Sequence, residues 1–152
     1  MNHPGSPTTT IERRDNSRMV IDNLLQEREQ LLVLYCKVAG LEPYTEETPV
    51  ERMVGDFCQI LVDYVAAVHF EVFSRLSEGS ERRRSVLDAA DRNYDFVAHT
   101  TQQAVDFNDK YDGSDAEHLK GSLPGDLSHL GEVLAERFEK EDEVFSALLD
   151  KD

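Results

Sequence analysis

Four long stretches of this 152-residue chain carry apolar residues at the three- and four-residue spacing of an α-helix, separated by short breakers. No segment shows sustained two-residue alternation with the composition of a β-strand. The pattern therefore predicts an all-α fold. Four helices of about 25 residues with mostly short links favour an antiparallel four-helix bundle with long helices, each roughly 40 Å in length.

The first two predicted helices have the clearest boundaries. The first is expected at about Asp15–Ala39, because Gly40 follows as a helix terminator and Pro43 blocks continuation. The second is expected at about Thr48–Leu76, with Thr48 as the capping residue. It is apolar over much of its circumference, which is typical of a helix at the centre of a fold. Its predicted core stripe consists of Phe57, Leu61, Val68 and Val72.

The last two helices have weaker signals. The third is expected from near Ser80, with a small and partly polar stripe made of Leu87, Ala90, Tyr94, Val97, Thr101 and Ala104. The fourth is expected to begin between Ser122 and Asp126, because Pro124 should be tolerated only in a first helical turn. Residues 1–12 are predicted to form a flexible, disordered N-terminal tail, and residues 13–152 a single helical-bundle domain.

The charge of the chain limits its partners. Asp and Glu number 31 against 16 Lys and Arg, a formal net charge of −15. Such a surface repels the phosphates of bare nucleic acid and of an anionic membrane, so direct binding to either is not expected. Its field attracts a basic partner instead.

Targeting signals are not found in the sequence. No apolar run approaches the roughly 20 residues needed to span a bilayer. The polar segment at residues 1–10 lacks the apolar core of a signal peptide, so a cytoplasmic protein is expected. Cys36 and Cys58 lie in helical patterns and fit reduced thiols better than a disulfide.

Metal and catalytic motifs are equally scarce. A di-iron bundle needs Glu-x-x-His on two helices, and this sequence lacks that pattern. The pairs Asp115/His118 and Asp126/His129 have usable spacing, but each is isolated in or beside a loop and is expected to be solvated or to form a cap. Cys58 and His69 would lie about 16 Å apart on one helix, too far for a catalytic dyad. We therefore expect no enzyme activity, no metal and no cofactor.

The polar residues of the second helix are more informative. They recur three, four and seven residues apart, on a face turned aside from the core stripe: Asp56, Gln59, Asp63 and Phe70. Asp63 interrupts an apolar run and has two interpretations. It is either a structural carboxylate paired with Arg28 or Arg137, or an anchor for a basic side chain of a partner.

The fourth helix places a carboxylate on its inward side. Glu141 falls seven residues after Leu134 and seven before Leu148, both of which belong to the apolar stripe. This position predicts that at least one carboxylate here is buried or lines an interface.

Several segments resemble one protein family. The second helix contains Asp56-Phe57-Cys58-Gln59, Leu61-Val62-Asp63-Tyr64, Ala67 and His69-Phe70, which closely resembles the signature of the Rsd/AlgQ family. Similar stretches in the other helices are Glu27-Arg28 with Leu31-Leu32, Thr100-Thr101-Gln102-Gln103, and Leu134 with Glu136-Arg137-Phe138 and Glu141-Asp142. The resemblance covers roughly residues 18–150.

This resemblance implies an all-α anti-sigma factor. Family members bind the primary sigma factor of RNA polymerase, chiefly through its C-terminal domain that recognises the −35 promoter element, and favour alternative sigma factors in stationary phase. Some also bind a phosphotransfer-system carrier protein, a second candidate partner that these residues do not assign.

Helix geometry adds the expected roles of individual residues. Asp56, Gln59, Asp63 and Phe70 are predicted to contribute to the sigma-binding face, with Glu71 and Phe73 as weaker candidates on neighbouring faces. His69, Arg137 and Glu141 are expected to be structural or partner-binding.

Two other classes compete with this interpretation. One is a metal- or ligand-binding helical bundle of hemerythrin or ferritin type. The other is a structural bundle that oligomerises through the apolar segment between Phe57 and Phe73.

Overall fold

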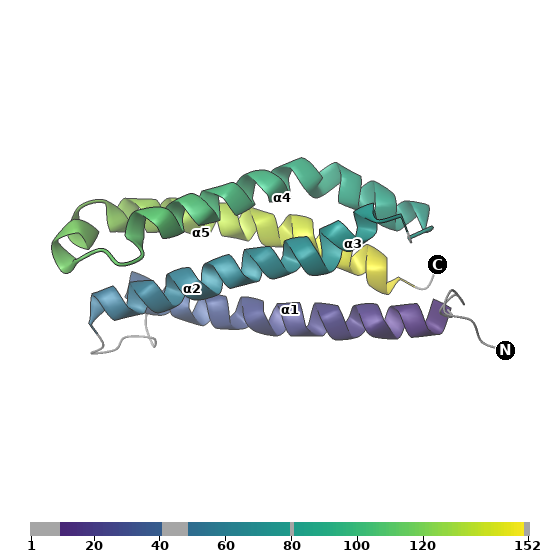
Figure 1. The fold of residues 1–152 in the computed structure, drawn as a ribbon, viewed down its shortest axis with the longest axis horizontal. Coiled ribbons are helices and arrows are strands. Elements are labelled where there is room, and N and C mark those ends of the chain that lie inside the picture. Colours follow the sequence, from purple (N-terminus) through teal and green to yellow (C-terminus); the bar gives the residue numbers. More distant parts are fainter. Residues whose placement is uncertain (1–9, 41–48, 80, 151–152) are drawn as a thin grey trace.

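The computed structural model describes residues 10–40, 49–79 and 81–150. Its helical elements are α1 (Thr10–Ala39), α2 (Val50–Val68), the π-helical turn η1 (His69–Phe73), α3 (Ser74–Ser77), α4 (Arg84–Tyr111) and α5 (Ala116–Leu149). Because α2, η1 and α3 follow one another without a break, they form one continuous rod that packs lengthwise with α1, α4 and α5 (Figure 1). The described residues contain no strand, and the all-α prediction is confirmed.

Helix boundaries agree with the sequence at some ends and differ at others. The rod from α2 to α3 ends at Ser77, one residue after its expected end, and Gly79 follows with a φ of 88° that favours glycine. The expected capping residue Thr48 and most of the predicted tail at residues 1–12 lie outside the described residues. Within that tail, α1 begins at Thr10.

The start of α5 corrects the sequence prediction. The helix begins at Ala116, so Pro124 lies in its interior and not in its first turn. Proline removes the hydrogen bond to the carbonyl four residues earlier, which belongs to Lys120. Lys120 is exposed, so water can bind the released carbonyl, and the helix continues.

The predicted core stripe of the second helix is buried along its whole length. On α4 the prediction is correct only in part: Ala90, Val97 and Ala104 are buried as expected, whereas Tyr94 is exposed. The buried face also contains Val86, Asn93, Thr100 and Phe107. Two polar residues are buried there because both are hydrogen-bonded. The Asn93 amide donates to the Ala89 carbonyl over 2.8 Å, and the Thr100 hydroxyl donates to the Phe96 carbonyl over 3.0 Å.

Helices α1 and α5 approach each other closely near Gly131. The Tyr35 hydroxyl donates a hydrogen bond to the Leu127 carbonyl over 2.9 Å. A Cβ atom at Gly131 would overlap the hydroxyl end of the Tyr35 ring. The absence of a side chain at Gly131 is therefore what admits Tyr35 between the two helices.

One helical run in the described residues, Val50–Ser77, is long and apolar enough to cross a membrane by length and composition alone. Much of its apolar surface faces the other helices: Phe57, Leu61, Val65 and Val68 are all buried. The core helix of a soluble bundle meets the same criterion.

Candidate functional site

The outward face of α2 carries a row of polar side chains. Asp56, Gln59 and Asp63 are all exposed, in keeping with their spacing on one helix face. The Gln59 side chain donates a hydrogen bond from Nε2 to Oδ1 of Asp63 over 3.0 Å. This bond joins neighbouring turns of the same helix. It fixes the two side chains relative to each other while both remain exposed.

Asp63 does not have the buried ion pair that one interpretation of the sequence required. It is exposed, and the proposed pairing with Arg28 or Arg137 is wrong. The physical reason is its angular position: Asp63 comes two residues after the buried Leu61, about 200° further round the helix.

A third acidic residue from α1 lies near this row. Partial burial, together with the charges of Glu71 and Asp63, raises the pKa of the Glu27 carboxyl. Like charges from two helices therefore act on one another here, and the surface presents a concentrated negative field.

The π-helical turn η1 decides which of its side chains face outward. Phe70 is 65% exposed and Glu71 is also exposed, whereas Val72 and Phe73 are both buried. At about 100° per residue, an uninterrupted α-helix would bury Val72 and turn Phe73 to its edge. A π turn advances less per residue, so both reach the core.

Of the predicted residues in η1, Phe73 differs from its expected position and His69 does not. Phe73, expected near a partner, packs beneath the surface with its ring centroid 6.2 Å from that of Tyr94. His69 is half-buried, and its ring meets Phe70 edge-on at 4.9 Å.

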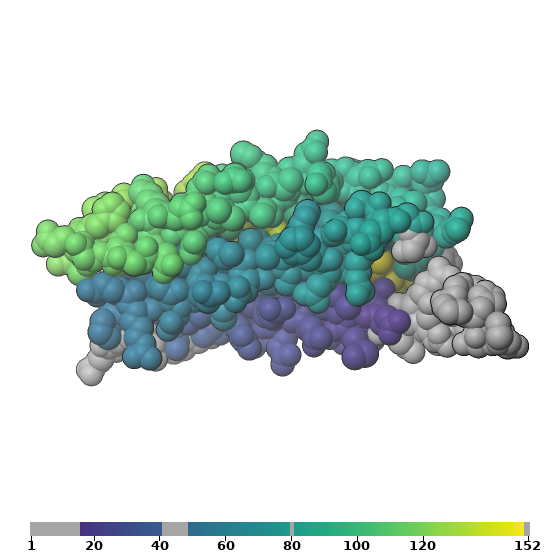
Figure 2. All heavy atoms as spheres, in the orientation of Figure 1, coloured from purple at the N-terminus to yellow at the C-terminus, as the bar shows by residue number. Residues whose placement is uncertain are grey.

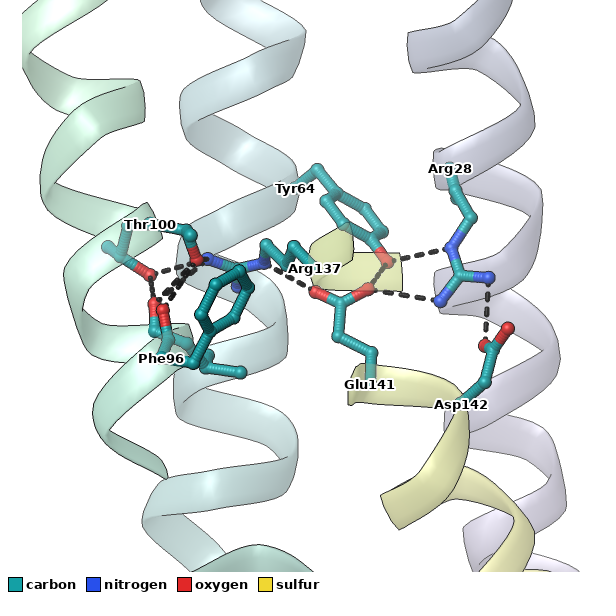
Figure 3. A network of polar contacts seen from close by, with 9 residues as sticks. Arg28, Tyr64, Phe96, Thr100, Arg137, Glu141 and Asp142 are labelled. Atoms are coloured by element: carbon teal, nitrogen blue, oxygen red, sulfur yellow. Dashed lines mark hydrogen bonds and ion pairs between the residues drawn. The ribbon is translucent and has the colours of Figure 1, made fainter. Parts of the chain in front are cut away.

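A second set of predicted residues forms a buried polar network in the middle of the bundle (Figure 3). Arg137 and Glu141 are completely buried. Arg137 donates from Nε to Oε2 of Glu141 over 2.6 Å, and from its Nη1 to the Thr101 hydroxyl over 2.7 Å. The other carboxylate oxygen, Oε1, accepts from the Tyr64 hydroxyl over 2.5 Å and from Arg28 over 3.0 Å.

The network joins all four rods. Arg28 is on α1, Tyr64 on α2, Thr101 on α4, and Arg137 and Glu141 on α5. The expectation of an inward-facing Glu141 is met, and the carboxylate is matched by two guanidinium groups. Such matching is what allows a charge to remain in a dry core.

Ionisation of the network residues is shaped by burial and by their neighbours. Burial raises the pKa of Tyr64 far above its usual range, and the Glu141 charge raises it further, so Tyr64 remains a neutral hydrogen-bond donor. Burial opposes the charge of Arg28, but Tyr64 and the carboxylates of Glu141 and Asp142 outweigh it and raise the pKa of Arg28. Arg28 also pairs with Asp142 at 2.9 Å.

Arg28 and Arg137 were both offered as partners of Asp63, and both pair with Glu141 instead. Arg28 could have been recognised from the sequence as an inward-facing residue. Its position carried a usable signal, because it continues the buried stripe of α1 between Leu24 and Leu31. A charged residue on an apolar stripe predicts that a counter-charge is buried beside it, but the stripe does not identify which residue supplies that charge.

The isolated Asp/His pairs have local partners. Asp115 caps α5 by accepting a hydrogen bond from the His118 backbone amide over 2.9 Å, as expected for a cap. Asp126 accepts from Lys110 over 2.7 Å and from the Tyr111 hydroxyl. These contacts, with Lys110 as the largest contribution, lower the pKa of Asp126.

Asp126 and His129 also line a shallow groove of about 230 Å³ between α4 and α5. Its floor contains Phe107, Leu130 and Val133. The described residues contain no group of three or more His, Cys, Asp or Glu side chains that could hold a metal ion.

Fold and site together define an acidic all-α bundle, held by a buried ion-pair network, with an acidic outward face on α2. A family model described as "Regulator of RNA polymerase sigma(70) subunit, Rsd/AlgQ" matches residues 6–149. The chain therefore belongs to the Rsd/AlgQ family.

Similar proteins support the same assignment. A regulator of sigma D from Yersinia pseudotuberculosis serotype O:1b (strain IP 31758) is 33% identical over 144 residues, covering 88% of this chain and 81% of the relative. The protein of that name from Enterobacter sp. (strain 638) is 34% identical over 149 residues, covering 91% and 86%. The one from Salmonella typhi is 32% identical over 143 residues, covering 92% and 88%. No solved structure matches the chain.

Proposed function

We propose that this protein is a non-catalytic anti-sigma factor. It binds the primary sigma factor of bacterial RNA polymerase and holds it away from core polymerase and promoter. The observation that carries the proposal is the family match over residues 6–149. It is supported by relatives named regulator of sigma D that align over 81% or more of their own length.

The proposed contact is with the C-terminal sigma domain that reads the −35 element. A domain that grips promoter DNA must present a basic helix-turn-helix surface. The net charge of −15 steers such a domain toward this protein. The exposed carboxylates of Asp56 and Asp63 then stand in for DNA phosphates, with Gln59 holding Asp63 in place.

The biological setting follows from this contact. Sequestration of the primary sigma factor leaves core polymerase to alternative sigma factors in stationary phase. The protein would act in the cytoplasm, where polymerase works, and residues 13–152 would serve as one domain for this task. A phosphotransfer-system carrier protein remains a predicted second partner.

The test uses the full chain and the isolated C-terminal domain of the primary sigma factor. Isothermal titration calorimetry at low salt is expected to give a one-to-one complex. Asp63→Asn should weaken it roughly tenfold, because one charge at the contact is removed. This variant keeps the oxygen that Gln59 bonds, and Asp63 is exposed, so the fold should be unchanged.

Glu139→Gln is the matched control. Glu139 is exposed on α5, and its substitution changes the net charge by the same amount. It should leave the affinity nearly unchanged. Failure of the well-folded wild-type protein to bind the sigma domain at low salt would contradict the proposal.

The competing class, a metal- or ligand-binding bundle, is not favoured by the family match. Elemental analysis of protein purified without chelators tests it directly, because stoichiometric iron or zinc would revive it.

A further inference from the structure

Two aromatic side chains are largely exposed on neighbouring helices. Phe70 of η1 is 65% exposed, and Tyr94 of α4 is 45% exposed. Figure 2 shows the face on which the α2–η1–α3 rod and α4 lie next to each other. Burial of such rings against a partner would remove apolar area from water and so favour binding.

Contacts between rings connect the two helices at this point. The ring of Tyr94 packs against the buried ring of Phe73, with 6.2 Å between their centroids. The ring of Phe70 packs against that of His69, with 4.9 Å between their centroids. Residues 69–73 form one π turn, so Phe70 and Phe73 are positioned by the same element. Tyr94 is therefore held next to the turn that carries Phe70.

The π turn explains why Phe70 is available. Because the turn rotates Phe73 toward the core, the Phe73 ring contacts Tyr94 of α4, while Phe70 and Glu71 stay outside. π turns within α-helices occur frequently at functional sites, because they re-aim side chains at some cost to the helix.

Exposed acidic residues lie close to both rings in the sequence. Asp63 and Glu71 are exposed on the α2–η1 side, and Asp91 and Asp95 are exposed beside Tyr94 on α4. Aromatic anchors within a polar rim are the arrangement in which most binding energy of a protein interface is concentrated. An acidic rim fits a basic partner, and it disfavours a second copy of a chain whose net charge is −15.

We propose that Phe70 and Tyr94 are the two aromatic anchors of the sigma-binding surface, which therefore extends from α2 across η1 onto α4. The occupant is the basic, DNA-reading C-terminal domain of the primary sigma factor, with its apolar side chains over the rings and its basic side chains over the rim. This inference rests on the proposed function, and adds Tyr94 and α4 to it.

The affinity test compares exposed apolar side chains on different faces. Tyr94→Ala and Phe70→Ala should each weaken binding of the sigma domain by roughly tenfold or more. Leu32→Ala is the matched control: Leu32 is 42% exposed, but on α1, and its removal should change the affinity less than twofold. Tyr94→Phe should retain most of the affinity, because the ring remains.

A second measurement does not depend on affinity. The chain contains no tryptophan, so Tyr94→Trp introduces a single indole fluorophore. After subtraction of the spectrum of the wild-type complex, its emission should shift to shorter wavelength when the sigma domain binds. Leu32→Trp, treated the same way, should show no shift.

The outcomes separate the two proposals. In one outcome, wild-type protein binds the sigma domain, Asp63→Asn weakens binding, Tyr94→Ala binds normally, and the emission of Tyr94→Trp does not shift. That outcome overturns the aromatic anchors and leaves the proposed function standing. If wild-type protein does not bind, both fall. A dimer of the free chain that Tyr94→Ala dissociates would overturn the sigma domain as the occupant.

Discussion

Glu141 is the side chain on which the interior of this bundle depends. Its carboxylate is fully buried and accepts hydrogen bonds from Arg137, Arg28 and Tyr64. Each oxygen has its own guanidinium partner. The cost of removing these charges from water is thus offset by contacts that exist only in the folded state.

Substitution Glu141→Ala should lower the free energy of unfolding by about 3–5 kcal/mol, because it leaves buried guanidinium groups without their counter-charge. Urea denaturation followed by circular dichroism measures the change. Glu139→Ala, two residues earlier and exposed, should stay within about 0.5 kcal/mol of the wild type. A loss below about 1 kcal/mol for Glu141→Ala would mean that the network contributes little to stability.

At the residue scale, the sequence predicted which side chains are buried better than which ones meet. The seven-residue spacing from Leu134 and Leu148 was enough to turn Glu141 inward. The partner of Arg28 could not be read in the same way. That choice depends on how two helices are aligned along their length, and periodicity within each helix carries no information about it.

At the scale of elements, the seam between α1 and α5 depends on a glycine. Tyr35 reaches across to bond the Leu127 carbonyl, and a Cβ at Gly131 would overlap its ring. Glycine normally weakens a helix by about 1 kcal/mol relative to alanine. At Gly131 this loss is offset by the close packing of α1 against α5.

Gly131→Ala should therefore destabilise the protein by about 1–3 kcal/mol, because displacement of Tyr35 outweighs the gain in helix propensity. Gly121→Ala provides the control in the same helix. A Cβ there meets nothing within 4 Å, so this variant should gain about 0.5–1 kcal/mol. Thermal unfolding of both variants tests the difference, and equal stability would show that α1 and α5 are not in close contact at this point.

Helix ends were predictable where a helix-terminating residue acts independently of tertiary packing. Gly79 marks the end of the α2–η1–α3 rod within two residues. Pro124 misled the prediction because its effect on α5 depends on solvent access to the Lys120 carbonyl, a tertiary property. The π turn could not be predicted either. It is favoured by the packing of Phe73 against Tyr94 of α4, and the spacing of apolar residues along the helix does not indicate it.

At the scale of the whole molecule, the net charge of −15 has two opposing consequences. It attracts a basic partner over a long range, and its acidic side chains repel one another in the folded state. The raised pKa of Glu27, caused first by burial and then by Glu71 and Asp63, is a local sign of this self-repulsion. The partner's positive charges would relieve it on binding.

Added salt should therefore act in opposite directions on the free protein and on its complex. Between about 50 mM and 300 mM NaCl, screening should raise the melting temperature of the free chain, because like charges repel less. Over the same range the Kd for the sigma domain should rise on the order of tenfold, because attraction between the partners is screened as well. Differential scanning calorimetry and titration calorimetry in matched buffers measure the two effects. Affinity that does not respond to salt would rule out an electrostatic contact between this acidic surface and a DNA-reading domain, even if a complex forms.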